Sequence, residues 1–158
     1  MSLDGFVRCN CIREGKAKPH PFPERLTFDE IGEPVLTGDP TEDEWEAHDE
    51  WVAESCEHGG FLLSLFLGNI TRVKNLRGFL ENLEDDPGPK FPILLEEVLY
   101  DGTHTGDWVP SEETAALLKE VETVLHSRDI LSDSEKEFFE NMKQLCEASL
   151  ATGNPVMF

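Results

Sequence analysis

Hydrophobic and polar residues alternate at the start of the chain. In GFVRCNCI, residues 5–12, the side chains of Val7, Cys9 and Cys11 occupy every second position. This alternation predicts a strand with those three side chains on one face. The apolar run FLLSLFL, residues 61–67, predicts a second, buried strand. Two shorter candidates are an edge strand at 33–36 and a final strand in the tail, 154–158.

Helical spacing of apolar residues predicts most of the remaining structure. Helices are expected over residues 42–56, 70–83, 111–126 and 133–152, with a short apolar helix from Pro92. Thr41 precedes Glu44 by three residues, and Ser132 precedes Glu135 in the same way. This spacing is typical of a capping box and marks the starts of the first and last long helices. Gly153 then ends the last helix.

The helix expected over 42–56 has two different faces. Its apolar stripe, which we expect to be buried, consists of Trp45, His48, Val52 and Cys56. Acidic side chains cover the rest of its surface and are expected to remain in water: Glu42, Asp43, Glu46, Asp49, Glu50 and Glu54.

The order of these elements indicates the fold class. Prolines at positions 19, 21 and 23 forbid regular structure in residues 13–25, which are expected to form an extended loop. The chain contains no internal repeat and no low-complexity tract. We therefore expect one domain over residues 1–158, of the α+β class, dominated by helices and holding a small, mainly antiparallel sheet.

Composition favours a folded protein away from membranes. The chain has 158 residues, 39% of them hydrophobic and ten of them Phe, which is enough for a real core. No run approaches the roughly 20 apolar residues of a membrane helix. The first residues lack the apolar segment of a secretory signal. We therefore expect a cytoplasmic protein, in a reducing compartment where thiols bind metals or stay free more often than they form disulfides.

Charge is the strongest signal in the composition. Thirteen basic residues face thirty-three acidic ones, for a net charge of −20, and residues 29–57 contain twelve acidic residues but no Lys or Arg. Binding to nucleic acids or anionic membranes depends on Lys and Arg, so neither is expected. Two interpretations stay open. The charge keeps the protein dispersed, or it forms a surface that recognises a basic protein partner.

Two short motifs supply candidate metal ligands. Cys9 and Cys11 are separated by one residue, and the same spacing recurs in Cys56 and His58 at the end of the acidic helix. Together they make a Cys3His set, which suits tetrahedral structural zinc. A zinc ion held in this way would connect the first strand to the end of the helix.

Other interpretations of the cysteines also stay open. The interval between Cys11 and Cys56 matches no common zinc-finger spacing, so these thiols are alternatively small buried hydrophobic groups. A disulfide from Cys56 to Cys9 or Cys11 is a further alternative. Cys146, within the last helix, is expected in the core.

A glycine-bearing loop holds the other candidate pair. His104 and Asp107 lie three residues apart in YDGTHTGD. They suit a metal ligand with its orienting carboxylate, or an acid–base pair, and His104 is an alternate fourth ligand in place of His58. The simpler interpretation is a hydrogen-bonded turn.

Several segments together resemble a group of uncharacterised bacterial proteins of similar length. They are VRCNCIREGK, ESCEHGG, VLYDGTHTGD and the terminal TGNPVMF, and the resemblance spans most of the chain. It implies no activity and no role for any residue. It does imply that the regions around Cys9, Cys56 and His104 belong to one layout.

The sequence favours a binding protein over an enzyme. It contains no GxSxG, GxxxxGK[ST], GxGxxG or HExxH motif. We expect a non-enzymatic, acidic domain with a structural zinc site, acting as an immunity-like or antitoxin-like inhibitor of a basic partner through the exposed carboxylates of residues 42–56. The alternatives are a small metal-dependent hydrolase, with His104 and Asp107 at an open position, and a thiol-based redox or metal sensor.

Overall fold

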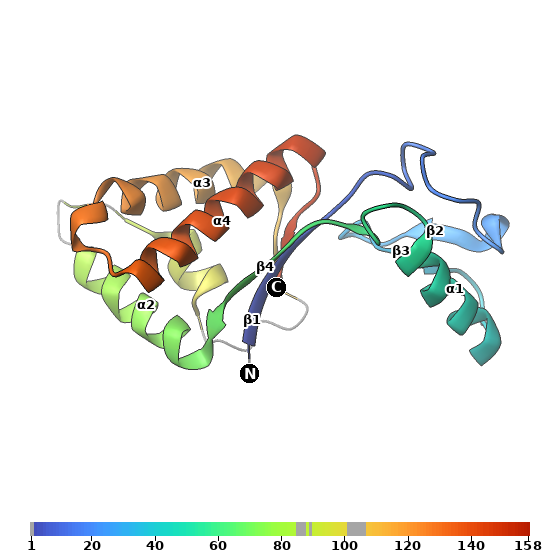
Figure 1. Cartoon of the computed structure of the whole chain (residues 1–158), viewed down its shortest axis with the longest axis horizontal. Coiled ribbons are helices and arrows are strands. Elements are labelled where there is room, and N and C mark those ends of the chain that lie inside the picture. Colours follow the sequence, from blue (N-terminus) through green and yellow to red (C-terminus); the bar gives the residue numbers. More distant parts are fainter. Residues whose placement is uncertain (1, 85–87, 89, 101–106) are drawn as a thin grey trace. The chain divides into compact units, whose positions relative to one another are not determined.

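The computed structural model describes residues 2–84, 88, 90–100 and 107–158. The chain forms two compact units. Unit 2 is the segment Arg8–Leu63, and unit 1 comprises the residues up to Val7 together with Ser64–Phe158. The α+β class, the dominance of helices and the small antiparallel sheet are confirmed (Figure 1). The expectation of one domain over residues 1–158 stays a prediction.

A four-stranded sheet belongs mainly to unit 1. Its order is β4-β1-β6-β5, from the strands Phe61–Asn69, Ser2–Arg8, Val156–Met157 and Trp108–Val109. β6 pairs antiparallel with both β1 and β5, with Met157 opposite Phe6 and Trp108. The sequence predicts that β4 is buried, but Leu62, Ser64 and Phe66 are exposed, because side chains alternate between the two faces of the strand and one of these faces is open to water.

Five helical segments lie in the described part of unit 1. They are α2 (Ile70–Leu83), a π-helical turn (Leu94–Val98), α3 (Ser111–His126), a 3-10 turn (Arg128–Ile130) and α4 (Asp133–Thr152). The capping box at Ser132 and the left-handed Gly153 delimit α4, as the sequence predicts. α4 packs on β1 at Gly5, where an added Cβ would lie 2.4 Å from Leu145.

Unit 2 consists of a hairpin, a helix, a short 3-10 turn (Pro23–Arg25) and long connections. The 3-10 turn lies in the proline-rich stretch, where the sequence predicts no regular structure. β2 (Leu26–Phe28) pairs antiparallel with β3 (Pro34–Leu36), and α1 spans Glu42–Glu54. The sequence predicts β3 but misses β2, whose three residues directly follow the proline-rich stretch. The Thr41 hydroxyl accepts the Glu44 N–H, and the Glu44 carboxylate accepts the Thr41 N–H, so the predicted capping box is present.

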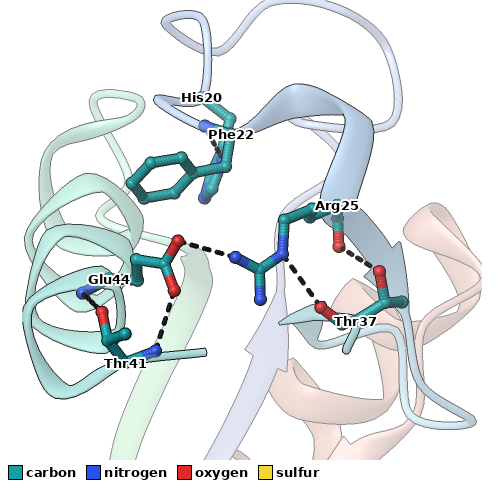
Figure 2. A network of polar contacts seen from close by, with 6 residues as sticks. All are labelled: His20, Phe22, Arg25, Thr37, Thr41 and Glu44. Carbon is teal, nitrogen blue, oxygen red and sulfur yellow. Dashed lines mark hydrogen bonds and ion pairs between the residues drawn. The ribbon is translucent and has the colours of Figure 1, made fainter. Parts of the chain in front are cut away.

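An arginine joins the hairpin of unit 2 to α1. Arg25 donates to the Glu44 carboxylate at 2.7 Å and to the Thr37 carbonyl at 3.1 Å (Figure 2). Hydrogen bonds from the Thr41 backbone and from Arg25 hold the pKa of Glu44 below its usual range. One carboxylate therefore caps the helix and, through Arg25, also ties it to the open end of the hairpin, where β2 begins and β3 ends.

Two local predictions in unit 2 are wrong. The first strand ends at Arg8, so Cys9 and Cys11 follow it instead of lying on it. In α1, Trp45 is 42% exposed, whereas Trp51 and His48 are buried. The apolar stripe is displaced because α1 packs its buried side on the chain around His20, instead of on a large core. None of the helices in the described ranges is long and apolar enough to cross a bilayer.

Candidate metal centre

The first half of the site is a turn that follows β1. Cys9 comes directly after the strand, and the Asn10 carbonyl accepts the Glu14 N–H at 2.9 Å. The Cys11 carbonyl accepts two further N–H groups, from Lys16 and Ala17. These bonds reverse the chain immediately after Cys9, so a turn rather than a pleated strand presents the two thiols.

The second half is a tight turn after α1. The Cys56 carbonyl accepts the Gly59 N–H at 3.1 Å, and the His58 carbonyl accepts the Phe61 N–H at 3.2 Å. Gly59 and Gly60 have φ values of 57° and 88°, a region that favours glycine. The Cys9 N–H donates to the Gly60 carbonyl at 3.1 Å, which brings the two halves together.

The geometry of the four side chains suits one metal ion. The ligand atoms of Cys9, Cys11, Cys56 and His58 all lie within 4.8 Å of one another. The Cys9 and Cys56 sulfurs are 3.7 Å apart, and the Cys11 sulfur lies 3.2 Å from His58 Nδ1. Tetrahedral zinc with ordinary bond lengths needs about 3.8 Å between sulfurs and about 3.5 Å from sulfur to nitrogen. The four residues could therefore hold a metal without rearrangement of the turns.

The alternative interpretations of the cysteines fit less well. All four cysteines are free thiols, so the proposed disulfides are not formed. Cys9, Cys11 and Cys56 are only half-buried, whereas Cys146 is fully buried in α4. Burial raises the pKa of the Cys146 thiol to about 12. Cys146 is thus the core thiol that the sequence predicts, and the other three have a different environment.

Ionisation of the cluster is uneven. Burial opposes the Cys56 thiolate, but N–H groups of Gly60 and His58 and the thiols of Cys9 and Cys11 hydrogen-bond to it and lower its pKa to about 6. Burial, together with hydrogen bonds and charge from Cys9 and Cys56, raises the pKa of Cys11 to about 11. A thiolate at Cys56 therefore makes ionisation of the Cys11 thiol less favourable. A bound cation offsets the repulsion between neighbouring thiolates, because its charge stabilises all of them.

Two arginines lie beside the cluster. The Arg8 side chain is buried, forms an ion pair with Glu33 at 3.0 Å and lies over the Phe61 ring. Arg13 lies over the Phe28 ring, and both arginines line a small cavity with Cys9. Two guanidinium groups therefore place positive charge beside Cys9, and that of Arg8 is already paired with Glu33. The sequence offers no motif that places Arg8 at this cavity.

The second candidate pair is described only in part. His104, the alternate ligand, lies outside the described residues. Asp107 belongs to unit 1, where its carboxylate accepts a hydrogen bond from the Tyr100 hydroxyl. The roles offered for His104 and Asp107 stay predictions.

The acidic face of α1 is exposed. Its six candidate partner-binding residues are all exposed: Glu42, Asp43, Glu46, Asp49, Glu50 and Glu54. Trp45 lies among them and is 42% exposed, a feature that the sequence pattern predicts wrongly. An exposed tryptophan is common where proteins bind one another.

Comparison of the chain with models of protein families, with curated proteins and with solved structures gave no match. Inference about function therefore starts from the Cys3His cluster and its surroundings.

Proposed function

We propose that this protein is a non-enzymatic binding protein in which one structural zinc ion stabilises unit 2. The observation that supports this proposal is the convergence of three sulfurs and one imidazole nitrogen within 4.8 Å. Thiolate and imidazole ligands together favour zinc over magnesium or calcium. Four protein ligands fill a tetrahedral shell and leave no open position for a substrate, so a structural role is favoured over a hydrolase.

The composition of unit 2 gives a reason for a structural metal. Unit 2 has 56 residues, and among them Leu36 and Trp51 are the only buried large hydrophobic side chains. A unit of this size with so little apolar burial needs another source of stability. In zinc-finger peptides, zinc binding supplies about 10–16 kcal/mol, which becomes folding free energy because the unfolded chain has no formed site.

Metal analysis of three proteins tests the zinc site. Wild type, Cys11→Ser and Cys146→Ala are purified without added metal, and zinc per chain is measured by elemental mass spectrometry. We expect one zinc in wild type and in Cys146→Ala, the matched control, and less than a tenth of that in Cys11→Ser. Wild type without zinc, or Cys11→Ser with a full complement, would contradict the proposal.

The acidic face of α1 supports the second part of the proposal, recognition of a basic partner. Zinc would fix the turn directly after α1, so that the helix presents its six exposed carboxylates from a defined surface. Complementary charge raises association rates in a salt-dependent way. An immunity-like or antitoxin-like inhibitor of a basic, nucleic-acid-binding toxin domain is the most specific form of this proposal.

A charge-reversal variant tests the recognition of a partner. Glu46, Asp49 and Glu50 are changed to Lys in one variant, and Glu112, Glu113 and Glu140, on helices of unit 1, are changed in the matched control. Binding to a panel of basic toxin nuclease domains is followed by stopped-flow kinetics at several salt concentrations. For the domain that wild type binds, we expect association at least tenfold slower and a flatter salt dependence in the α1 variant alone. Equal effects of both variants, or no binding by wild type, would contradict an acidic recognition face.

A further inference from the structure

Two buried histidines of unit 2 form a hydrogen-bonded relay. The Phe22 N–H donates to His20 Nδ1 at 2.8 Å (Figure 2). His20 Nε2 lies 3.0 Å from His48 Nδ1, and His48 Nε2 lies 3.0 Å from the Pro34 carbonyl oxygen. The relay therefore links the proline-rich connection, α1 and the start of β3.

The two ends of the relay determine where its protons lie. A backbone N–H can only donate, so His20 Nδ1 must accept and His20 must carry its proton on Nε2. That proton is donated to His48 Nδ1. The proton of His48 then lies on Nε2 and is donated to the Pro34 carbonyl. Both imidazoles are neutral in this arrangement, and each has one defined tautomer.

A further proton on either ring is incompatible with the relay. A cationic imidazole donates from both nitrogens. Protonation of His20 would direct Nδ1–H at the Phe22 N–H, and protonation of His48 would direct Nδ1–H at His20 Nε2–H. Since His20 and His48 are 7% and 3% exposed, water has little access to relieve either contact.

The relay holds a defined stretch of chain against α1. The Trp51 indole N–H donates to the Lys18 carbonyl at 2.9 Å, and the His20 ring meets the Trp51 ring edge-on at 4.4 Å between centroids. The Lys18 N–H donates to the Ser55 carbonyl at 2.7 Å. We name the segment 18–22 the strap. These contacts and the relay together attach the strap along one side of α1.

The groups around the relay have opposite effects on the pKa of His20. Burial, and then the charge of His48, lower the pKa of His20, whereas the negative charge of Glu24 acts in the opposite direction. The Phe22 N–H, which donates to Nδ1, also favours the neutral ring. Glu44 on α1 is engaged by Arg25, and the Trp45 ring lies 5.8 Å from the His48 ring. The net effect favours a neutral His20 at neutral pH.

We propose that the His20–His48 relay is a pH-operated latch, closed when both rings are neutral, whose protonation releases the strap from α1. This inference goes beyond the proposed zinc site and does not depend on it. The lowered pKa of His20 means that the contribution of the relay to stability is fully present above about pH 6.5, the unfolded value, and declines as pH falls below it. Release of the strap would expose the side of α1 that it covers, and α1 is the helix that carries the acidic face.

Long-range ¹H–¹⁵N spectra of the imidazoles test the starting state. At pH 7.5 we expect both His20 and His48 as neutral Nε2–H tautomers. An Nδ1–H tautomer at either ring, or a cationic His20 at that pH, would overturn the proposal.

Hydrogen exchange of the Trp51 indole N–H and the Phe22 amide tests the release. After correction for intrinsic exchange, we expect protection at both sites to fall about tenfold per pH unit just below pH 6.5. Zinc content is measured at each pH, because acid also removes zinc from thiolates and the strap continues into the turn of Cys11. Loss of protection only after zinc release would overturn the latch.

Variants at two histidines complete the test. His20→Gln retains a donor toward His48 and removes one titrating group, so the slope of protection against pH should be at least halved. His126→Gln, which removes an exposed imidazole from α3, should leave that slope unchanged. Should His20→Gln not fold, the wild-type titration still decides the question.

Discussion

Unit 1 and unit 2 bury very different amounts of hydrophobic surface. Unit 1 encloses a continuous set of fully buried side chains, including Phe91, Leu117, Phe138, Met142 and Leu145. In unit 2, Leu36 and Trp51 are the only large hydrophobic side chains that are buried. Much of its structure depends on directional contacts: the Cys3His cluster, the histidine relay, and the Arg25–Glu44 ion pair. Hydrophobic packing tolerates small shifts, but ligand and hydrogen-bond geometry does not. We therefore expect the two units to respond to different perturbations.

Loss of one metal ligand should have the largest effect. Cys56→Ser removes the thiol to which the N–H groups of Gly60 and His58 hydrogen-bond. We expect the amide signals of residues 8–63 to collapse to unfolded positions in an NMR spectrum, while those of α3 and α4 stay dispersed. Cys146→Ala serves as the comparison, since that thiol lies in the core of unit 1. A dispersed unit 2 in Cys56→Ser would show that the cluster does not support its fold.

Loss of a core side chain should act on unit 1 alone. Leu117 is fully buried on α3, and Leu→Ala changes in cores cost about 2–5 kcal/mol. Denaturant unfolding followed at unit 1 amides should show a loss in this range for Leu117→Ala, with unchanged zinc content. Leu150→Ala, on the exposed side of α4, should cost less than about 0.5 kcal/mol. Zinc loss in Leu117→Ala would mean that unit 2 depends on the core of unit 1.

Matched capping boxes allow a smaller test. Thr41 caps α1 and Ser132 caps α4 with the same arrangement of hydrogen bonds. Replacing either residue by Ala should cost about 1 kcal/mol locally. Because the turn that holds Cys56 and His58 directly follows α1, we expect Thr41→Ala to speed zinc transfer to a chelator several-fold, and Ser132→Ala to leave the transfer rate unchanged. Equal transfer rates would show that α1 does not support the cluster.

The stability of the two units should respond to pH in opposite directions, and the change at Glu97 is the smallest effect that we expect. Burial and the charges of Glu113, Glu120 and Glu96 raise the pKa of Glu97 in unit 1. The folded state therefore holds this proton more tightly, and the contribution of Glu97 to stability declines as pH rises through and above the usual range near 4.5. Unit 2 instead loses stability as pH falls below about 6.5, through His20. Glu97→Gln should stabilise unit 1 at pH 7, by less than about 0.5 kcal/mol because the group is partly solvated. Unfolding curves at pH 5 and pH 7 measure this difference, and a destabilised variant would contradict it.

Local signals in the sequence predicted much of the fold and the candidate site. Capping residues predicted the start of α1 and both ends of α4, because capping depends on a few adjacent residues. The pairs Cys9–Cys11 and Cys56–His58 predicted the cluster, since the chemistry of zinc restricts the choice of ligands.

Features that depend on distant contacts could not be predicted in this way. The alternation through Cys11 suggested a longer strand, but the hydrogen bond from Glu14 to the Asn10 carbonyl turns the chain. Trp51, and not Trp45, is the buried indole, because the strap rather than a large core covers this side of α1. The His20–His48 relay joins residues that are 28 positions apart, and neither residue lies in a recognisable motif.

We propose that a bound metal ion, in place of a hydrophobic core, stabilises unit 2. Hydrogen exchange read by mass spectrometry, on the zinc-loaded protein and on the same protein after a strong chelator, tests it most directly. We expect protection across residues 8–63 to fall to the level of an unfolded chain after chelation, while peptides of α3 and α4 exchange at unchanged rates. Retained protection in 8–63 without bound metal would contradict the claim and assign the stability of unit 2 to its hydrogen bonds alone.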